Sequence, residues 1–367
     1  MENTAEVKGI SFEEYILKMK REFDEFNNAT VKCAMIGQSG SGKSTLINTI
    51  FGENICNTGT VETTLKKSGP FEKDGVSFFD LPGCGTVKFP KETYIEEMDL
   101  KSFDFIILVT ANRFYENDLF LIQEMDKIKK PIYIVRTKID QAINEGEFNH
   151  PKKSEYEVLS ECLYDLEKYL TTVSHFGIYL ISARQPSKFD LGKLLLNISK
   201  NLTNVKKQKF IAEIFISNEE ILKAKREIAE KIVNWSSVLS GANGLNPIPG
   251  LDIAADLGVI ISMNKKILKI FGLDEDSIKF LEKFGTLAGT VLSIKGFAAQ
   301  FLSKELVVLS LKKYIPQIAG KQFAKFFPIV GQITSVIISA GLTKYLGTVT
   351  VNSCEIQAKE ILNDLTK

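Results

Sequence analysis

A glycine-rich stretch from Gly37 to Ser44, GQSGSGKS, constrains the fold of this chain more than any other feature. It follows the apolar run VKCAMI at 31–36 and leads into TLINTIF at 45–51. A strand, a glycine loop and a helix in this order bind phosphate groups, because the loop N–H groups and the helix N-terminus both favour anions. The stretch therefore predicts a nucleotide-binding α/β fold.

Each residue type in this loop has a predicted role. Glycines let the backbone approach phosphate oxygens without a clash of side chains. Lys43 is expected to place its charge on the outer phosphates, and the Ser44 hydroxyl to bind Mg²⁺. The predicted nucleotide contacts in this loop are Gly37, Ser39, Gly40, Ser41, Gly42, Lys43, Ser44 and Thr45.

Short apolar runs alternate with helix-like segments through the first 203 residues. The runs lie at 31–36, 75–79, 104–110, 131–136 and 177–181. The helix-like segments lie at 43–52, 91–100, 116–129, 154–173 and 190–203. This alternation predicts a mostly parallel sheet with helices on both faces and a ligand at the carboxyl ends of its strands.

The tetrapeptide TKID at 137–140, at the end of a predicted strand, favours guanine over adenine. The carboxylate of Asp140 can accept hydrogen bonds from the N1–H and the exocyclic amine of guanine, and adenine offers neither donor there. The stem of Lys138 can lie over the base. Thr137 stands where this motif usually has Asn, so we expect a weaker local scaffold. The predicted guanine contacts are Thr137, Lys138, Asp140, Ser182 and Ala183.

Two further stretches are expected to sense the terminal phosphate. In DLPGCGT at 80–86, Asp80 is predicted to hold the Mg²⁺ shell and the Gly83 N–H to bond the γ-phosphate. In TVETT at 60–64, Thr64 is the predicted metal ligand, with Thr63 as the alternative.

Cys84 stands where many GTP-hydrolysing proteins have the glutamine that orients the attacking water. A thiol is a weak hydrogen-bonding group and cannot orient water as a carboxamide does. We therefore interpret Cys84 as a small packing residue.

The strand pattern ends at about residue 204. Apolar spacing then predicts helices at 217–236, 250–271, 274–285, 287–303, 304–314, 316–327, 329–346 and 353–366, and another at 9–28. We expect an N-terminal helical segment at 1–29 packed on a helical domain at 204–367. Between them, residues 30–203 are expected to form a P-loop G domain.

Composition excludes several protein classes. The chain has 46 Lys and Arg against 45 Asp and Glu, so no net charge draws it to nucleic acid. Five cysteines without C-x-x-C spacing argue against a zinc site or a disulfide framework. No secretory signal is recognised, and the apolar stretch at 326–343 fits a buried helix better than a membrane span. We expect a cytoplasmic protein.

Lysine clusters leave peripheral membrane contact open. They could meet anionic lipid headgroups, although lysines that solvate the outside of a helical bundle explain them as well. The lysines concerned are Lys206, Lys207, Lys209, Lys265, Lys266 and Lys269.

The ordered set GQSGSGKS, TVETT, DLPGCGT, TKID and SAR resembles the G domains of the immunity-related GTPases, which are interferon-inducible and dynamin-like. The segment ANRFYEND at 111–118 adds to the resemblance. So do the helical stretches KKQKFIAEIF and IPGLDIAADLGVIISMNKKILKIFGLDEDSIK. The resemblance covers nearly the whole chain.

The resemblance implies binding of GTP and GDP with Mg²⁺ and slow GTP hydrolysis that G-domain self-association accelerates. It implies a role in cell-autonomous defence or remodelling at intracellular membranes. It also implies that Glu62 assists hydrolysis and that Arg113 and Asp118 lie at a homodimer interface. The predicted catalytic residues are Lys43, Glu62, Thr64 and Gly83, and the predicted metal ligands are Ser44, Thr64 and Asp80.

Two alternatives remain. One is a nucleotide-switched scaffold with negligible hydrolysis. The other is an Era-like GTPase with a helical, membrane-associated tail. The chain begins Met-Glu and not Met-Gly, so we do not expect an N-terminal myristoyl anchor.

Overall fold

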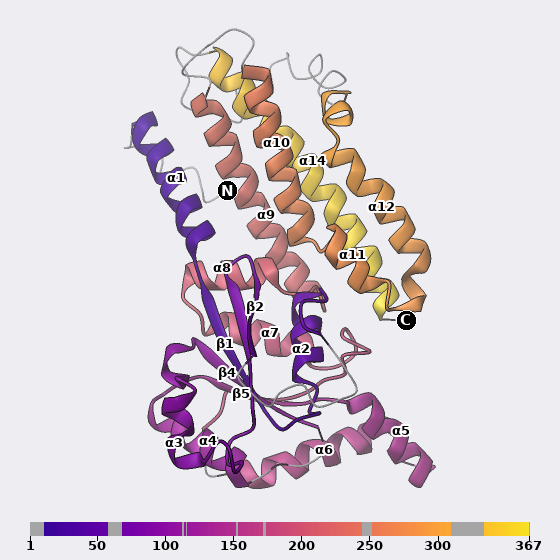
Figure 1. The fold of residues 1–367 in the computed structure, drawn as a ribbon. Helices are drawn as coiled ribbons and strands as arrows, with labels where there is room; N and C mark the ends of the chain where they lie inside the picture. The colour runs from indigo at the N-terminus through magenta and orange to yellow at the C-terminus, as the bar shows by residue number, and fades with distance from the viewer. Residues whose placement is uncertain are drawn as a thin grey trace. The chain divides into compact units, whose positions relative to one another are not determined.

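The computed structural model describes residues 11–57, 68–111, 114, 116–151, 153–171, 174–243, 252–309 and 334–366 (Figure 1). The chain divides into two compact units. The first, which we call the sheet unit, comprises 29–221, 279–288 and 361–367. The second, the helical unit, comprises 1–28, 222–278 and 289–360.

A six-stranded sheet in the order β2-β3-β1-β4-β5-β6 organises the sheet unit (Figure 1). Only the pair β2–β3 is antiparallel, so the prediction of a mostly parallel sheet is confirmed. The five parallel strands end at one edge of the sheet. The strands are β1 Val31–Ile36, β2 Ser68–Lys73, β3 Val76–Leu81, β4 Phe105–Thr110, β5 Ile132–Arg136 and β6 Ile178–Leu180.

Strand β2 was absent from the sequence prediction. Its sequence SGPFEK contains glycine, proline and two charges, which are unfavourable in a central strand. It is tolerated here because β2 lies at the edge and pairs only with β3, with an irregular register between Ser68 and Phe71.

Both faces of the sheet are buried, as the near-continuous apolar strands require. Successive residues of β1 alternate between two cores, with Cys33 and Met35 in one and Ala34 and Ile36 in the other. One core is covered by α2 Lys43–Phe51, α7 Leu191–Lys200 and α8 Asn204–Glu213. The other is covered by α3 Lys91–Glu97, α4 Glu116–Lys127 and α6 Glu155–Leu170.

Helix α8 groups with the sheet unit, whereas residues from 204 onward were expected in the helical domain. The reason is aromatic packing: the ring of Phe210 lies 5.8 Å from that of Phe105 in β4, edge to face. The chain beyond α8 also returns to α2, where the Phe215 N–H donates to the Ile50 carbonyl at 2.7 Å. The packing of this aromatic ring against the sheet thus places α8 with the sheet unit, despite the basic composition of the helix.

The helical unit is built mainly from long helices. In α1, the rings of Phe23 and Phe26 pack against Trp235 of α9 at 5.6 and 5.4 Å. Such aromatic pairs add about 0.5–1.5 kcal/mol each beyond burial. The main helices are α1 Phe12–Asn28, α9 Glu219–Asn243, α10 Asp252–Ile270, α12 Ala288–Leu302 and α14 Thr334–Leu365. The short helix α11 Glu275–Leu281 is divided between the two units after residue 278.

Helix α14 runs unbroken through the gap expected between helices at 329–346 and 353–366, so that predicted break is wrong. Gly347 lies inside the helix. A methyl group there would come within 2.7 Å of Val233 and 2.9 Å of the Met263 sulfur. The glycine therefore serves close helix packing and does not end the helix. The predicted helix at 316–327 lies outside the described residues, as do residues 310–314 and 329–333 of its predicted neighbours.

Candidate functional site

The predicted nucleotide residues come together where the parallel strands end. β1 leads into Gly37, β3 into the loop at Pro82, β5 into Thr137 and β6 into Ser182. In the sheet β3 lies next to β1 and β5 next to β6, with β4 between the two pairs. Residues that lie far apart in sequence thus share one edge.

The loop after β1 needs its glycines for two different reasons. Gly40 and Gly42 have φ angles of 75° and 91°, in the left-handed region that side chains disfavour. At Gly37 the reason is space, because a methyl group would lie 2.1 Å from the Val109 carbonyl oxygen of β4. Ser39 and Thr45 are exposed and Ser41 is buried.

Lys43 is buried at the first turn of α2 and reaches back across the loop. Its Nζ donates to the Gly37 carbonyl at 2.8 Å and the Gln38 carbonyl at 3.1 Å, and lies 3.6 Å from Asp80. Burial lowers the pKa of Lys43, and Asp80 opposes part of that shift. The ammonium group is thus held inside the glycine loop, between two loop carbonyls and Asp80.

Ser44 and Asp80 form the candidate metal position. The Ser44 hydroxyl donates to Oδ2 of Asp80 at 2.9 Å, which joins the start of α2 to β3. A hydroxyl and a carboxylate are the hard oxygen ligands that Mg²⁺ prefers, so this donor set fits the ion. Thr64, Thr63 and Glu62, predicted to act beside them, lie outside the described residues.

Tyr94 of α3 fixes the loop that follows β3. Its fully buried hydroxyl donates to the Pro82 carbonyl, and burial raises its pKa well above the ordinary value of 10.0. Because the peptide unit is planar, holding the Pro82 carbonyl also sets the direction of the Gly83 N–H. Sequence reasoning missed Tyr94, since no motif marks it.

Cys84 is buried in the core with Ile36 and Tyr94, so its interpretation as a packing residue is confirmed. Burial, with a smaller contribution from Asp118, raises the pKa of the Cys84 thiol to about 11. The thiol is therefore protonated at neutral pH.

Sequence reasoning also missed the side chain of Gln38, which lies against Gly83. A methyl group on Gly83 would approach its Nε2, Cδ and Oε1 within 2.7, 2.9 and 3.0 Å. The glutamine belongs to the variable part of the glycine loop, where the motif specifies no residue type.

Thr137 ties the guanine motif to the phosphate loop. Its buried hydroxyl donates to the Ser41 carbonyl at 2.6 Å, with the Thr110 carbonyl as a second acceptor at 3.3 Å. The threonine methyl lies 3.8 Å from where a Cβ at Gly42 would stand. The Thr137 hydroxyl thus makes a short bond to the loop, and the expected weakening relative to Asn stays a prediction.

The other predicted guanine contacts lie around the hydrogen bond from Thr137 to the phosphate loop. Lys138 has a left-handed backbone with φ 58°, and Asp140 is half-buried in the first turn of α5 Ile139–Asn149. The Asp140 carboxylate lies 3.9 Å from the exposed Arg184 guanidinium. The Ile139 N–H donates to the Ile181 carbonyl, which brings Ser182 and Ala183 beside the motif. Ser182 is buried and Ala183 is half-buried.

Of the two residues predicted at a homodimer interface, the structure describes only one. Arg113 lies outside the described residues. Asp118 is only 6% exposed, which argues against its predicted place at a homodimer interface. Asp118 lies at the start of α4, whose Asn117 amide donates to the Gly85 carbonyl at 3.4 Å and keeps this turn against the loop after β3.

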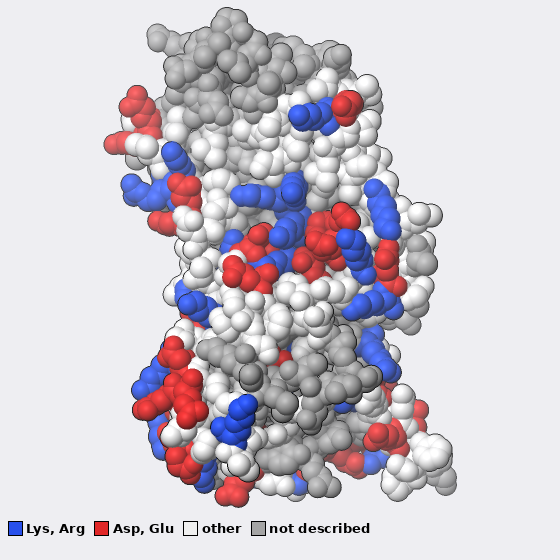
Figure 2. All heavy atoms as spheres, viewed as in Figure 1, with Lys and Arg blue, Asp and Glu red and all other residues white. Residues whose placement is uncertain are grey.

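The lysine clusters are largely engaged within the chain. Lys206 pairs with Asp104 at 2.6 Å, and Lys209 is buried. Lys266 donates to Asn27 at 2.9 Å and lies over the ring of Phe23. On the face shown in Figure 2, basic and acidic side chains lie interspersed. Lys206, Lys209 and Lys266 are therefore not available as a free basic patch.

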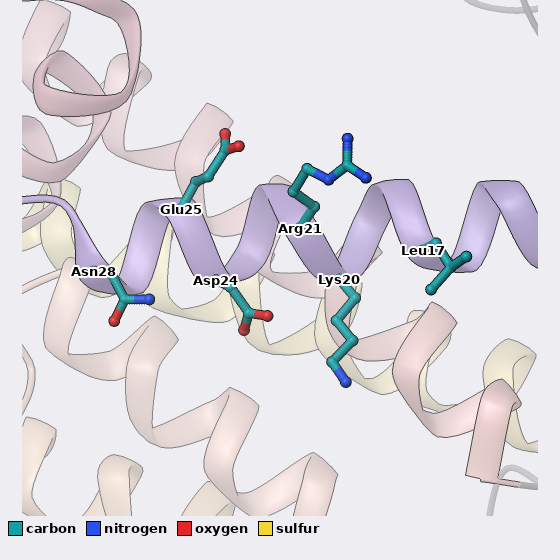
Figure 3. A pocket seen from close by; sticks show the side chains of 6 residues that line it. All are labelled: Leu17, Lys20, Arg21, Asp24, Glu25 and Asn28. Carbon is teal, nitrogen blue, oxygen red and sulfur yellow. The ribbon is translucent and has the colours of Figure 1, made fainter.

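A hollow on α1 does not belong to this site. Six side chains of that helix line it, with Lys20 and Asp24 extending to one side and Arg21 and Glu25 to the other (Figure 3). The other two are Leu17 and Asn28. None of the predicted nucleotide residues lines the hollow.

Within the described ranges, no helix is long and apolar enough to cross a membrane.

A comparison with protein families finds that the model of the interferon-inducible GTPases (IIGP) matches residues 4–365. Among curated proteins, mouse Interferon-inducible GTPase 1 is 29% identical over 277 residues, which is 71% of this chain and 65% of the relative. The mouse T-cell-specific guanine nucleotide triphosphate-binding protein 2 is 31% identical over 74% of this chain and 66% of the relative.

The chain thus spans just under two thirds of the length of these relatives. Interferon-inducible GTPase 5 of the rat is 29% identical over 85% of this chain and 70% of the relative. Among solved structures, the G domain of the T. maritima FeoB iron transporter is 26% identical over 47% of this chain and 99% of that chain, with a TM-score of 0.30.

Proposed function

The chain belongs to the interferon-inducible GTPase family, and from that premise we propose that it binds GTP and GDP with Mg²⁺ and hydrolyses GTP to GDP and phosphate. One observation carries the proposal. The buried Lys43 ammonium and the Ser44–Asp80 pair lie together at the loop after β1, and Thr137 links that loop to the TKID motif.

Different residues of the site would bind the phosphates, the metal ion and the guanine base. Lys43 would exchange the Gly37 and Gln38 carbonyls for phosphate oxygens, which bind an ammonium more strongly because they are charged. Ser44 and Asp80 would hold Mg²⁺, which when bound neutralises charge on the phosphates. Asp140 would accept from guanine, and Arg184 is too exposed and distant at 3.9 Å to compete strongly.

The Gly83 N–H is our proposed donor to the γ-phosphate. Tyr94 holds the adjoining carbonyl from within the core, so this N–H needs little reorganisation on binding. A larger residue at Gly83 would displace the end of the Gln38 side chain, which lies against it.

We further propose slow basal turnover that rises when G domains associate, with Glu62 and Thr64 acting in hydrolysis and Arg113 at the interface. Family membership supports this proposal, together with a role in cell-autonomous defence. Turnover per molecule should increase with protein concentration. A flat dependence, with GTP bound, would favour the nucleotide-switched scaffold.

Two variants, measured at the same series of protein concentrations, test the proposed roles of individual residues. Lys43→Ala should lose binding of both GTP and GDP, because its ammonium group is the main cation in the loop. Glu62→Ala should bind GTP like the wild type and lose only the concentration-dependent part of turnover. Unchanged turnover of Glu62→Ala at high protein concentration would remove Glu62 from the mechanism.

An exposed apolar stripe supports peripheral membrane contact as a second function. Leu292 is 74% exposed on α12, and Leu309 is 67% exposed on the helical turn at 304–309. Leu302, at the end of α12, and Leu306, on the turn at 304–309, lie between them in the chain and are also exposed. Helical segments with exposed apolar side chains can lie in the lipid–water interface.

Flotation with anionic vesicles, in GTP and in GDP, tests this contact. Leu292→Glu with Leu309→Glu should abolish flotation, whereas Leu17→Glu, at a 61% exposed leucine of α1, should not. Equal flotation of all three proteins would remove the stripe from the proposal.

A further inference from the structure

The side chain of Gln38 places a carboxamide against Gly83. Cys84, which stands where many GTP-hydrolysing proteins have a glutamine, supplies no such group. The three terminal atoms of Gln38 all lie 2.7–3.0 Å from the position of a methyl group on Gly83. Three nearly equal distances mean that the carboxamide lies across this glycine and does not merely touch it with one atom. The side chain is half-buried, so water reaches it.

The backbone of Gln38 is fixed by the phosphate loop. Its carbonyl accepts from the Lys43 ammonium at 3.1 Å and from the Ser41 N–H at 3.2 Å. Among the described residues, its side chain makes no hydrogen bond. An anchored backbone with an uncommitted carboxamide suits a group whose partners arrive with the substrate.

A carboxamide has the two functions that water positioning requires. Its oxygen accepts a hydrogen bond, and its nitrogen donates two. Cys84 has neither in useful form, because its thiol is protonated, weakly polar and packed in the core. Gln38 approaches Gly83 from the phosphate loop, whereas the usual glutamine follows this glycine in sequence.

We propose that Gln38 positions the water that attacks the γ-phosphate, an inference that rests on the GTPase function proposed above. Oε1 accepts from the water and Nε2 donates to a γ-phosphate oxygen. The water oxygen bonds to the γ-phosphorus, and the bond from phosphorus to the β–γ bridging oxygen breaks. Its electron pair leaves on GDP, and the water proton passes to the released phosphate.

This role differs from the one proposed for Glu62 in its dependence on concentration. Gln38 is part of the phosphate loop that binds the substrate in the same chain, so it acts in the monomer. A residue that acts only after self-association affects hydrolysis only at high protein concentration. The two contributions can therefore be separated in one series.

The test is single-turnover hydrolysis of GTP by the full chain with Mg²⁺, at a low and a high protein concentration. Gln38→Ala should be about 100-fold slower at both, the lower end of what a positioned proton-accepting group contributes. Its affinities for GTP and GDP should match the wild type. Gln123→Ala, at an exposed glutamine of α4, is the matched control and should hydrolyse normally.

Binding of GDP with aluminium fluoride, which mimics the transferring phosphoryl group, provides a second readout. Gln38→Ala should lose the fluoride-dependent gain in affinity and keep its affinity for GDP alone. Unchanged hydrolysis, slowing at high concentration only, or equal loss of GDP binding would each overturn the role of Gln38. A wild type that binds GTP without hydrolysing it would instead refute the proposed GTPase function, and this inference with it.

Discussion

Replacing Thr137 by valine tests whether the guanine motif holds the phosphate loop in shape. Valine keeps the branched shape and removes the hydroxyl that donates to the Ser41 carbonyl at 2.6 Å. That carbonyl accepts no other hydrogen bond from the described residues, and Ser41 is only 4% exposed. The substitution therefore leaves a buried acceptor without a donor.

The expected magnitude follows from that burial. An unsatisfied buried acceptor costs about 1–3 kcal/mol. The free energy of unfolding should fall by about this amount. Where nucleotide binding demands the intact loop, affinity for GDP should fall as well, by about tenfold for each 1.4 kcal/mol that appears in binding.

The assays are urea denaturation and titration with a fluorescent GDP analogue. Thr49→Val is the matched control, because Thr49 is equally buried and its hydroxyl donates to the Thr45 carbonyl at 2.8 Å inside α2. The Thr45 carbonyl retains its backbone helix bond, so this variant should lose less stability and no affinity. Thr137→Asn restores a donor and should bind GDP like the wild type.

Two results would refute this reasoning. Thr137→Val with wild-type stability and affinity would show that the short bond does not shape the loop. Equal losses in Thr137→Val and Thr49→Val would show that any buried hydroxyl matters equally and that the link between motifs has no special effect.

Three further predictions concern other parts of the chain. Tyr94→Phe removes the donor to the Pro82 carbonyl, so GTP hydrolysis should slow about tenfold or more while GDP affinity, measured in parallel, stays unchanged. Gly347→Ala should destabilise the protein by about 1–3 kcal/mol through contact with Val233 and Met263. Gly258→Ala, where a methyl group meets nothing within 4 Å, should stabilise it by about 0.4–1 kcal/mol in the same denaturation assay. Burial raises the pKa of Cys84 from 9.0 to about 11, so its contribution to stability is complete below pH 9 and is lost as pH rises toward 11. Cys84→Ala should therefore show a smaller loss of unfolding free energy between pH 8 and pH 10 than the wild type, and an equal loss would contradict the raised pKa.

The strands were the most predictable part of the fold. Runs such as VKCAMI are apolar apart from Lys32 because both faces of a parallel strand are largely buried, and β1 coincides with its predicted range. Three elements escaped prediction. β2 is polar and contains proline, α8 is rich in lysine, and α5 begins inside the TKID motif with only a short apolar spacing.

The glycine loop and TKID could be located from sequence because they specify local backbone geometry. Gly40 and Gly42 have the left-handed angles that the phosphate loop needs, and such angles depend on residue type more than on distant contacts. The sequence by itself therefore determined which loops carry the predicted nucleotide contacts, but not the parts played by Gln38 and Tyr94.

Contacts between strand ends were decided by the tertiary structure alone. The bond from Thr137 to Ser41 joins residues 96 positions apart, and the placement of Gln38 against Gly83 depends on β1 and β3 being neighbours. The same holds for Lys206, whose partner Asp104 lies 102 positions away and turns an apparent basic cluster into an internal ion pair. Local sequence encodes local angles, but only packing decides which distant side chains meet.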